Sequence, residues 1–309
     1  MNKSSVQNLV KNYSIETTIP QAERVERFSD TVPAGTCLYI AHIPGTNFTD
    51  TVALAARLRR EGMEPVPHVV GRRIANLEAL EDFLKRLSGD AGVKQVLCVA
   101  GDNATPEGQI TSALQVIESG LLEKYGIRTV GVAGHPEGHR EVADPVLRDA
   151  LRRKNAYADK TGSKVYVVTQ FTFTADSVTK WETANSADIG KLPVTVGLPG
   201  LASAKTLLKY AMDCGVGASL QAFSKRAASL TKLLTVNAPD DIIVGLAAHR
   251  DNNPNSHLSG VHFFPFGGFK KTADWANKVV AGNFELATWP SPNSMTSIRL
   301  PLKLCQRFC

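Results

Sequence analysis

Two histidines flank a turn directly after an apolar run. The stretch "VAGHPEGHRE" places His135 and His139 around a Pro-Glu-Gly turn that follows the apolar run ending at Ala133. A buried strand that ends in polar, turn-prone residues usually ends at a surface. Histidine can transfer protons, donate to anions or hold a metal. Which of these it does here depends on the polar groups that meet it.

Other apolar runs end in the same way. Glu16, His42 and His68 lie near the ends of the first three runs, Asp102 directly follows the fourth, and Gln170 lies within the sixth. Taken singly, a strand-end carboxylate or histidine is more often a surface or structural residue. In a closed parallel barrel, however, all of these side chains would lie at the C-terminal ends of the strands, where active sites form.

Eight β-branched runs alternate with amphipathic stretches, which is typical of parallel βα units. The runs are 12–18, 37–43, 64–70, 94–101, 127–134, 164–173, 193–200 and 260–266. Stretches with helical spacing include 50–62, 76–89 and 108–126. No G-x-G-x-x-G follows the first run, as it would in an open doubly wound sheet. The sequence therefore predicts an α/β fold, a single-domain (β/α)8 TIM barrel over residues 1–282.

The last strands are separated by a long insertion. Three helical stretches at 203–215, 217–234 and 239–250 predict extra helices between strands seven and eight. The tail 283–309 is basic, Pro/Ser-rich and not periodic, so we expect a C-terminal extension lying over the barrel.

The composition is that of a globular protein, with 43% hydrophobic and 21% charged residues. No apolar run approaches the length of a membrane helix and the first residues lack the core of a signal peptide, so we expect a cytoplasmic protein without membrane contact. The net charge of +6 indicates a basic surface or an anion site. Nucleic acid is disfavoured, because aromatic residues make up only 7% and no nucleic-acid-binding motif accompanies the charge.

The histidines at the strand ends could also form a metal site for hydrolase or lyase chemistry. They are His42, His68, His135 and His139. The carboxylate pairings of such sites are absent, so we expect no metal. Basic side chains near the histidines instead suit the anionic oxygens of a phosphorylated cofactor. These are Arg148, Arg152, Arg153, Lys154 and Lys160.

Five of these motifs together resemble those of a known family. "SIE" (14–16), "PHVV" (67–70), "AGDN" (100–103), "GHPEGH" (134–139) and "VVTQFTF" (167–173) are similar, in order and approximate spacing, to the strand-end motifs of methylenetetrahydrofolate reductases. The resemblance spans roughly residues 10–282. It implies a barrel that binds FAD and moves a hydride between reduced flavin and 5,10-methylenetetrahydrofolate, yielding 5-methyltetrahydrofolate.

The resemblance also implies roles for single residues. Glu16 matches the general acid that helps to open the folate ring, Asp102 matches a carboxylate beside both flavin and pterin, and Gln170 matches a folate ligand. The remaining matches are cofactor contacts. With Asp102, the expected FAD-binding set is His68, Gly101, Thr111, Ser112, His135, His139, Arg152 and Lys154.

Four positions depart from the family pattern. Ala100 replaces an arginine, so a cation near the flavin is missing, and His135 replaces a tyrosine. Ala204 stands where an aromatic residue stacks on nicotinamide, and Phe266-Gly267-Gly268 replaces "LNR", so the NADH surface is less well kept than the flavin and folate surfaces. We therefore expect either an electron carrier other than conventionally stacked NAD(P)H or operation as a 5-methyltetrahydrofolate oxidant. Two alternatives stay open: a non-folate, metal-dependent barrel hydrolase or lyase, and a catalytically silent folate- or flavin-binding protein. The sequence predicts no oligomeric state.

Overall fold

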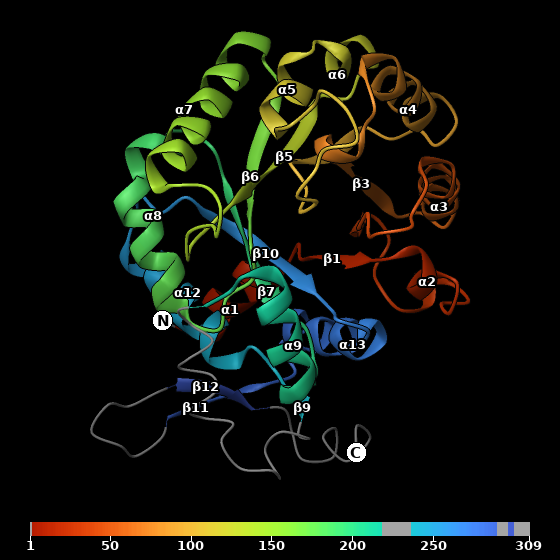
Figure 1. The fold of residues 1–309 in the computed structure, drawn as a ribbon. Helices are drawn as coiled ribbons and strands as arrows, with labels where there is room; N and C mark the ends of the chain where they lie inside the picture. The colour runs from red at the N-terminus through yellow and green to blue at the C-terminus, as the bar shows by residue number, and fades with distance from the viewer. Residues whose placement is uncertain (1, 218–235, 289–295, 300–309) are drawn as a thin grey trace.

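Eight parallel strands close into a barrel in the computed structural model, which describes residues 2–217, 236–288 and 296–299 (Figure 1). The order around the barrel is β1-β2-β3-β4-β5-β6-β7-β10, and β10 pairs with β1 to close it. The eight runs predicted from sequence are these strands, so the (β/α)8 prediction is confirmed. They are β1 (Ser14–Thr17), β2 (Cys37–Ile40), β3 (Glu64–Val70), β4 (Gln95–Val99), β5 (Thr129–Gly134), β6 (Lys164–Thr169), β7 (Val194–Pro199) and β10 (Leu258–Phe264).

Helices surround the barrel. They are α1 (Lys3–Val10), α2 (Ile19–Ala22), α3 (Phe48–Arg60), α4 (Leu77–Gly89), α5 (Ala113–Glu118), α6 (Leu121–Lys124), α7 (Asp144–Thr161), α8 (Ala175–Ile189), α9 (Ala204–Cys214), α12 (Asp240–Asn252) and α13 (Phe269–Val280). Local signals set their ends: the Asn47 and Asn76 side chains accept from the third helical N–H of α3 and α4, and Gly162 ends α7 in the left-handed conformation. None of these helices is long and apolar enough to cross a membrane.

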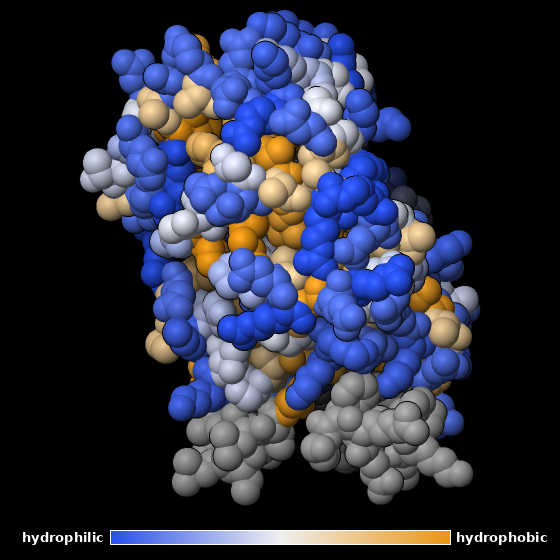
Figure 2. Space-filling model, turned by 90° about the vertical axis from the view of Figure 1, so that its right-hand side faces the viewer, coloured by the Kyte–Doolittle hydropathy of each residue, from blue (hydrophilic) through white to orange (hydrophobic). Residues whose placement is uncertain are grey.

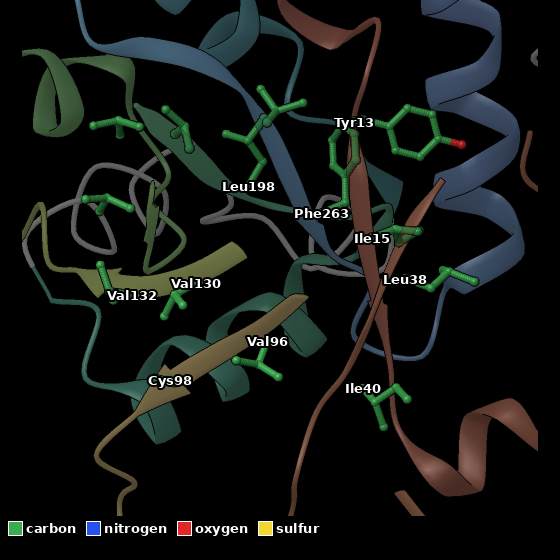
Figure 3. Packing of buried hydrophobic residues seen from close by; sticks show 14 of the residues in the cluster. Tyr13, Ile15, Leu38, Ile40, Val96, Cys98, Val130, Val132, Leu198 and Phe263 are labelled. Carbon is green, nitrogen blue, oxygen red and sulfur yellow. The ribbon is translucent and has the colours of Figure 1, made fainter. Parts of the chain in front are cut away.

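Alternate strand residues face opposite sides of the barrel wall. Outward-facing residues such as Leu38, Val96, Val130 and Phe263 are buried in the main core against the helices (Figure 3). Each such burial contributes about 1.5–3 kcal/mol. A second, small cluster around Tyr39 fills the inside together with polar side chains. The outer core stabilises the closed barrel, whereas the inside contains both apolar and polar side chains.

The segment 108–126 differs from its prediction as one helix. Only α5 and α6 are helical, because Ser112 caps α5 in a capping box with Gln115, and Gly120, at φ 76°, separates the two helices. The stretch before Ser112 is a loop on the C-terminal side of β4. Gln170 also differs slightly, since β6 ends at Thr169 and Gln170 follows the strand.

The insertion between β7 and β10 contains α9 and α12, as predicted; the stretch predicted at 217–234 lies almost wholly outside the described residues. A two-residue ladder, β8 (Ala202–Ser203) with β9 (Val236–Asn237), was not predicted, because so short a pair has no sequence period. The terminal helix α1 was not predicted either.

The described parts of the tail, 283–288 and 296–299, contain a strand pair that its composition does not indicate. β11 (Glu285–Thr288) pairs antiparallel with β12 (Thr296–Arg299), while Phe284 and Ile298 are buried in the main core. Hydrophobic residues also reach the surface elsewhere: on the side shown in Figure 2 they gather in the middle, within a border of hydrophilic residues.

Candidate functional site

The predicted carboxylates share one rim of the barrel. Glu16 lies in β1 and Asp102 follows β4, and the parallel strands all end on the same side. Cys214, at the end of α9, senses both groups: desolvation and the carboxylates of Glu16, Asp213 and Asp102 together raise the pKa of its thiol to about 11. The end of α9 therefore lies close to Glu16 and Asp102 together.

Glu16 lies between two histidines. Its Oε2 atom is 3.8 Å from Nε2 of His262 and 4.0 Å from Nε2 of His68. Burial lowers the pKa of His68 to about 4, although the charge of Glu16 opposes this shift, so His68 is neutral at pH 7. Sequence reasoning predicted Glu16 and His68 but missed His262. The alternation in "GVHFFPF" carried the signal, because it turns His262 inward between the outward-facing Val261 and Phe263.

Asp102 has a cationic neighbour. Its carboxylate is 86% exposed, and Oδ1 accepts from the Arg73 guanidinium at 3.2 Å. Arg73 ends the 3-10 turn η2 (Gly71–Arg73) after β3 and is only 15% exposed. The sequence comparison predicted that a cation is missing here, because Ala100 stands at the family's arginine position. The structure supplies one from the neighbouring strand end instead.

Gly101 occupies a position that needs glycine. Its φ is 104°, and a Cβ there would lie 2.6 Å from Cγ1 of Val70. Thr111 and Ser112 lie nearby, since a Cβ on Gly71 would lie 3.1 Å from the Ser112 carbonyl oxygen. The loops after β3 and β4 are therefore packed tightly, with no room for larger residues.

Gln170 is tied to neighbouring backbone. Its N–H donates to the Gly134 carbonyl at 2.9 Å, and its side-chain oxygen accepts from the Phe171 N–H at 3.0 Å. The side-chain amide is thereby oriented at the end of β6.

A cavity of about 850 Å³ lies beside the loop after β5, between α7 and α8. His135 and His139 line it, with their rings edge to face at 5.2 Å. Burial, assisted by Lys154 and His139, lowers the pKa of His135 to about 4. The turn after β5 therefore forms one wall of a cavity that is large enough for a cofactor.

Lys154 is the buried cation of this cavity. It is 6% exposed, and its Nζ donates to the Ala133 carbonyl at 3.2 Å. Burial lowers its pKa to about 8. Arg140, Arg148 and Lys180 also line the cavity, and Arg148 pairs with Asp188 at 2.6 Å. A cavity of this size with one buried and three further cations fits the diphosphate of a dinucleotide such as FAD.

Arg152 lies elsewhere. It forms ion pairs with Asp188 at 2.9 Å and Asp149 at 3.3 Å and is not among the residues lining the cavity. Arg153 pairs with Glu118. The structure thus brings Lys154, but not Arg152, together with His135 and His139.

His42 lies on the same rim but makes no metal cluster. Burial and Arg73 lower its pKa, and its ring packs against Phe48 at 5.3 Å. Across the described ranges, no three His, Cys, Asp or Glu side chains are grouped so that they could hold a metal.

An aromatic cluster that sequence reasoning missed lies beside α9. Phe266 stacks on Tyr210 at 4.3 Å and contacts Phe171 at 5.0 Å and Phe264 at 6.2 Å. Phe266 is the one described non-glycine residue with positive φ, 48°. Ala204 is fully buried at the start of α9. Aromatic side chains are therefore present near the predicted nicotinamide position, but they come from other segments of the chain.

A family model described as methylenetetrahydrofolate reductase matches residues 8–228. Among solved structures, an uncharacterized protein from Clostridium thermocellum, described as binding two copies of 5-methyl-5,6,7,8-tetrahydrofolic acid, is similar over 88% of this chain and 98% of its own, with a TM-score of 0.51 and 13% identity. A putative phosphonomutase from Burkholderia cenocepacia J2315 is similar over 90% of this chain and 96% of its own, with a TM-score of 0.48 and 12% identity. At such identity, structural likeness shows the fold alone.

Proposed function

The chain belongs to the methylenetetrahydrofolate reductase family, and from this premise we propose that it interconverts 5,10-methylenetetrahydrofolate and 5-methyltetrahydrofolate with FAD as its cofactor. The observation that carries the proposal is Glu16, a rim carboxylate within the matched residues, between His68 and His262. The Clostridium protein of similar fold, which binds 5-methyltetrahydrofolate, supports a folate ligand for such a barrel.

Glu16 would act on the folate as general acid. In the reductive direction its carboxyl donates a proton that helps to open the five-membered ring, and in the oxidative direction the carboxylate accepts it back. His68, neutral at pH 7, contributes no positive charge beside Glu16. Asp102 can accept from the N–H groups of the pterin, and the amide of Gln170 can bind its polar edge.

The cofactor would lie across the strand ends, from His68 and Gly101 to the cavity. FAD supplies the redox step when bound, and the protein supplies position and charge. Lys154 would donate to the diphosphate from within the cavity, with His135 and His139 beside it. Gly101 lets the loop after β4 take a positive φ and pack against Val70 beside the proposed ring site.

The electron partner in this proposal is not conventionally stacked NAD(P)H. Ala204 is buried and has no ring to stack on nicotinamide. The aromatic side chains of Phe266 and Tyr210 come from other segments of the chain. Anaerobic stopped-flow mixing with NADH tests the idea: reduction of bound FAD at low-micromolar NADH would refute it. Efficient reduction by 5-methyltetrahydrofolate is the expected result.

The overall proposal is tested with the purified protein. A flavin absorption band that bleaches during anaerobic titration with 5-methyltetrahydrofolate is expected, whereas a colourless protein that refuses added FAD would overturn the proposal. Glu16→Gln separates catalysis from binding: the variant should keep FAD and lose turnover. A protein that binds folate and FAD but shows no turnover before or after the substitution is a binding protein.

A further inference from the structure

The space inside the barrel beneath Glu16 is polar. Barrels of this class are usually filled by branched aliphatic side chains. Here the inside also contains Ser14, Tyr39, Gln95, Tyr166 and His262, which come from β1, β2, β4, β6 and β10. Buried polar atoms are costly unless they are hydrogen-bonded, so their arrangement needs a reason.

These side chains form a connected column. Gln95 Nε2 donates to the Tyr166 hydroxyl at 2.7 Å, and the Tyr166 and Tyr39 hydroxyls are 2.6 Å apart. The Tyr39 ring packs against the His262 ring at 4.3 Å, and Oγ of Ser14 is 2.9 Å from Nδ1 of His262. The column begins at the N-terminal end of β4 and ends beneath Glu16.

The imidazole of His262 is held on three sides. Besides the Ser14 contact, its ring packs against Tyr39 at 4.3 Å and meets Phe264 edge to face at 4.7 Å. The residue is only 1% exposed. The ring therefore has one orientation, in which Nδ1 faces Ser14 and Nε2 faces Glu16.

One neutral tautomer of His262 suits both of its polar neighbours. When the Ser14 hydroxyl donates to Nδ1 across the 2.9 Å contact, the ring proton lies on Nε2. An ionised carboxylate only accepts, so this tautomer is the one that suits Glu16.

We propose that His262 is the positioning residue of Glu16: its ring, fixed by Ser14, Tyr39 and Phe264, directs Nε2–H toward the Glu16 carboxyl from 3.8 Å and favours the orientation for proton exchange with folate. This inference rests on the proposed function for its chemical meaning. His68 is not an equivalent partner, because its side chain is 14% exposed against 1% for His262, and no hydrogen bond among the described residues fixes its ring as Ser14 fixes that of His262.

Long-range ¹H–¹⁵N spectra of histidine-labelled protein test the tautomer without any activity. The spectrum of His262, assigned through His262→Gln, should show one form with the proton on Nε2. Ser14→Ala should convert it to a mixture of tautomers. Two exchanging tautomers in the unsubstituted protein would overturn the inference, even if the protein proved to bind no flavin.

Single-turnover reduction of bound FAD by 5-methyltetrahydrofolate tests the consequence. General acid-base groups contribute about 10²–10⁴-fold, so His262→Phe is expected to slow the step by roughly 10–100-fold at unchanged folate affinity. His262→Gln, which restores an N–H near the Nε2 position, should recover most of the rate. His257→Gln, a histidine just before β10 that bonds Ser186, is the matched control and should react normally.

A His262→Phe protein with the normal rate would refute the positioning role while leaving the folate reaction intact. Equal slowing in the Phe and Gln variants would indicate a packing role only and would also refute it. If the unsubstituted protein fails to react with folate, the proposed function fails, and the spectra alone decide the inference.

Discussion

Replacement of Lys154 by Met should remove a rise in the apoprotein's free energy of unfolding at alkaline pH, and it should also weaken FAD binding. The lysine is buried, and burial lowers its pKa from 10.5 to about 8. In the unfolded chain the amine keeps its ordinary pKa, so between these two values the unfolded state binds more protons than the native state. The free energy of unfolding therefore rises with pH in this window.

The magnitude follows from the two pKa values. Below pH 8 both states carry the proton and the cost of the buried charge is fully present; above 10.5 neither does. At 1.36 kcal/mol per pH unit, the unfolding free energy should rise by about 2–3 kcal/mol between pH 7 and pH 10 because of Lys154 alone. Urea denaturation of the apoprotein and of Lys154→Met at both pH values isolates this part, because other groups cancel.

FAD binding should respond in the opposite direction. A protonated Lys154 donates to the diphosphate, and loss of a charge-assisted hydrogen bond costs about 1.5–3 kcal/mol, or roughly 10–150-fold in affinity. Fluorescence titration with FAD should show this loss in Lys154→Met and a weakening in the unsubstituted protein above pH 8. Equal pH slopes in the two proteins would show that the lysine does not titrate as reasoned.

Three further substitutions test the site and its frame. Gly101→Ala should cost about 1–3 kcal/mol in urea denaturation and weaken FAD binding, because the new Cβ meets Val70; Gly267→Ala, with positive φ but open space, should cost less. Arg73→Met should change unfolding free energy by less than about 1 kcal/mol, since Asp102 is exposed, yet raise the KM for folate; an unchanged KM would remove Arg73 from the site. Glu182→Leu should lower the unfolding free energy by about 3–5 kcal/mol, because His249, the Ser256 hydroxyl and the His257 N–H would lose their buried acceptor, with flavin reduction unchanged at moderate temperature.

The barrel was predictable because periodicity and turn chemistry agree along the chain. β-branched runs, amphipathic helices and closing glycines each indicate βα units, and eight units form a closed sheet. The prediction was wrong where two local signals compete, as at 108–126, where apolar spacing continues through a capping serine and a left-handed glycine. The β11–β12 pair was hidden because its stability comes from burial of Phe284 and Ile298, which a local pattern does not encode.

The sequence predicted only those site residues that lie at the ends of strands. Glu16, His68 and Asp102 stand where parallel strands must converge, so topology alone brings them to one rim. Arg73 and His262 depend on contacts between neighbouring strands, and no single segment shows them. The long helix α7 is the clearest case: every basic side chain on it looked like a phosphate ligand, and the fold directs Lys154 inward and Arg152 to Asp188.

The inside and the rim of this barrel are parts of one arrangement. An aliphatic interior would stabilise the fold equally well, since the outer core already supplies most of the apolar burial. The polar side chains beneath Glu16 instead give the buried imidazole of His262 a fixed direction. A proton donor at a barrel mouth needs such support from below, because the space above it must be left for the ligands. The polar interior is therefore best explained by the chemistry at the rim, and not by stability.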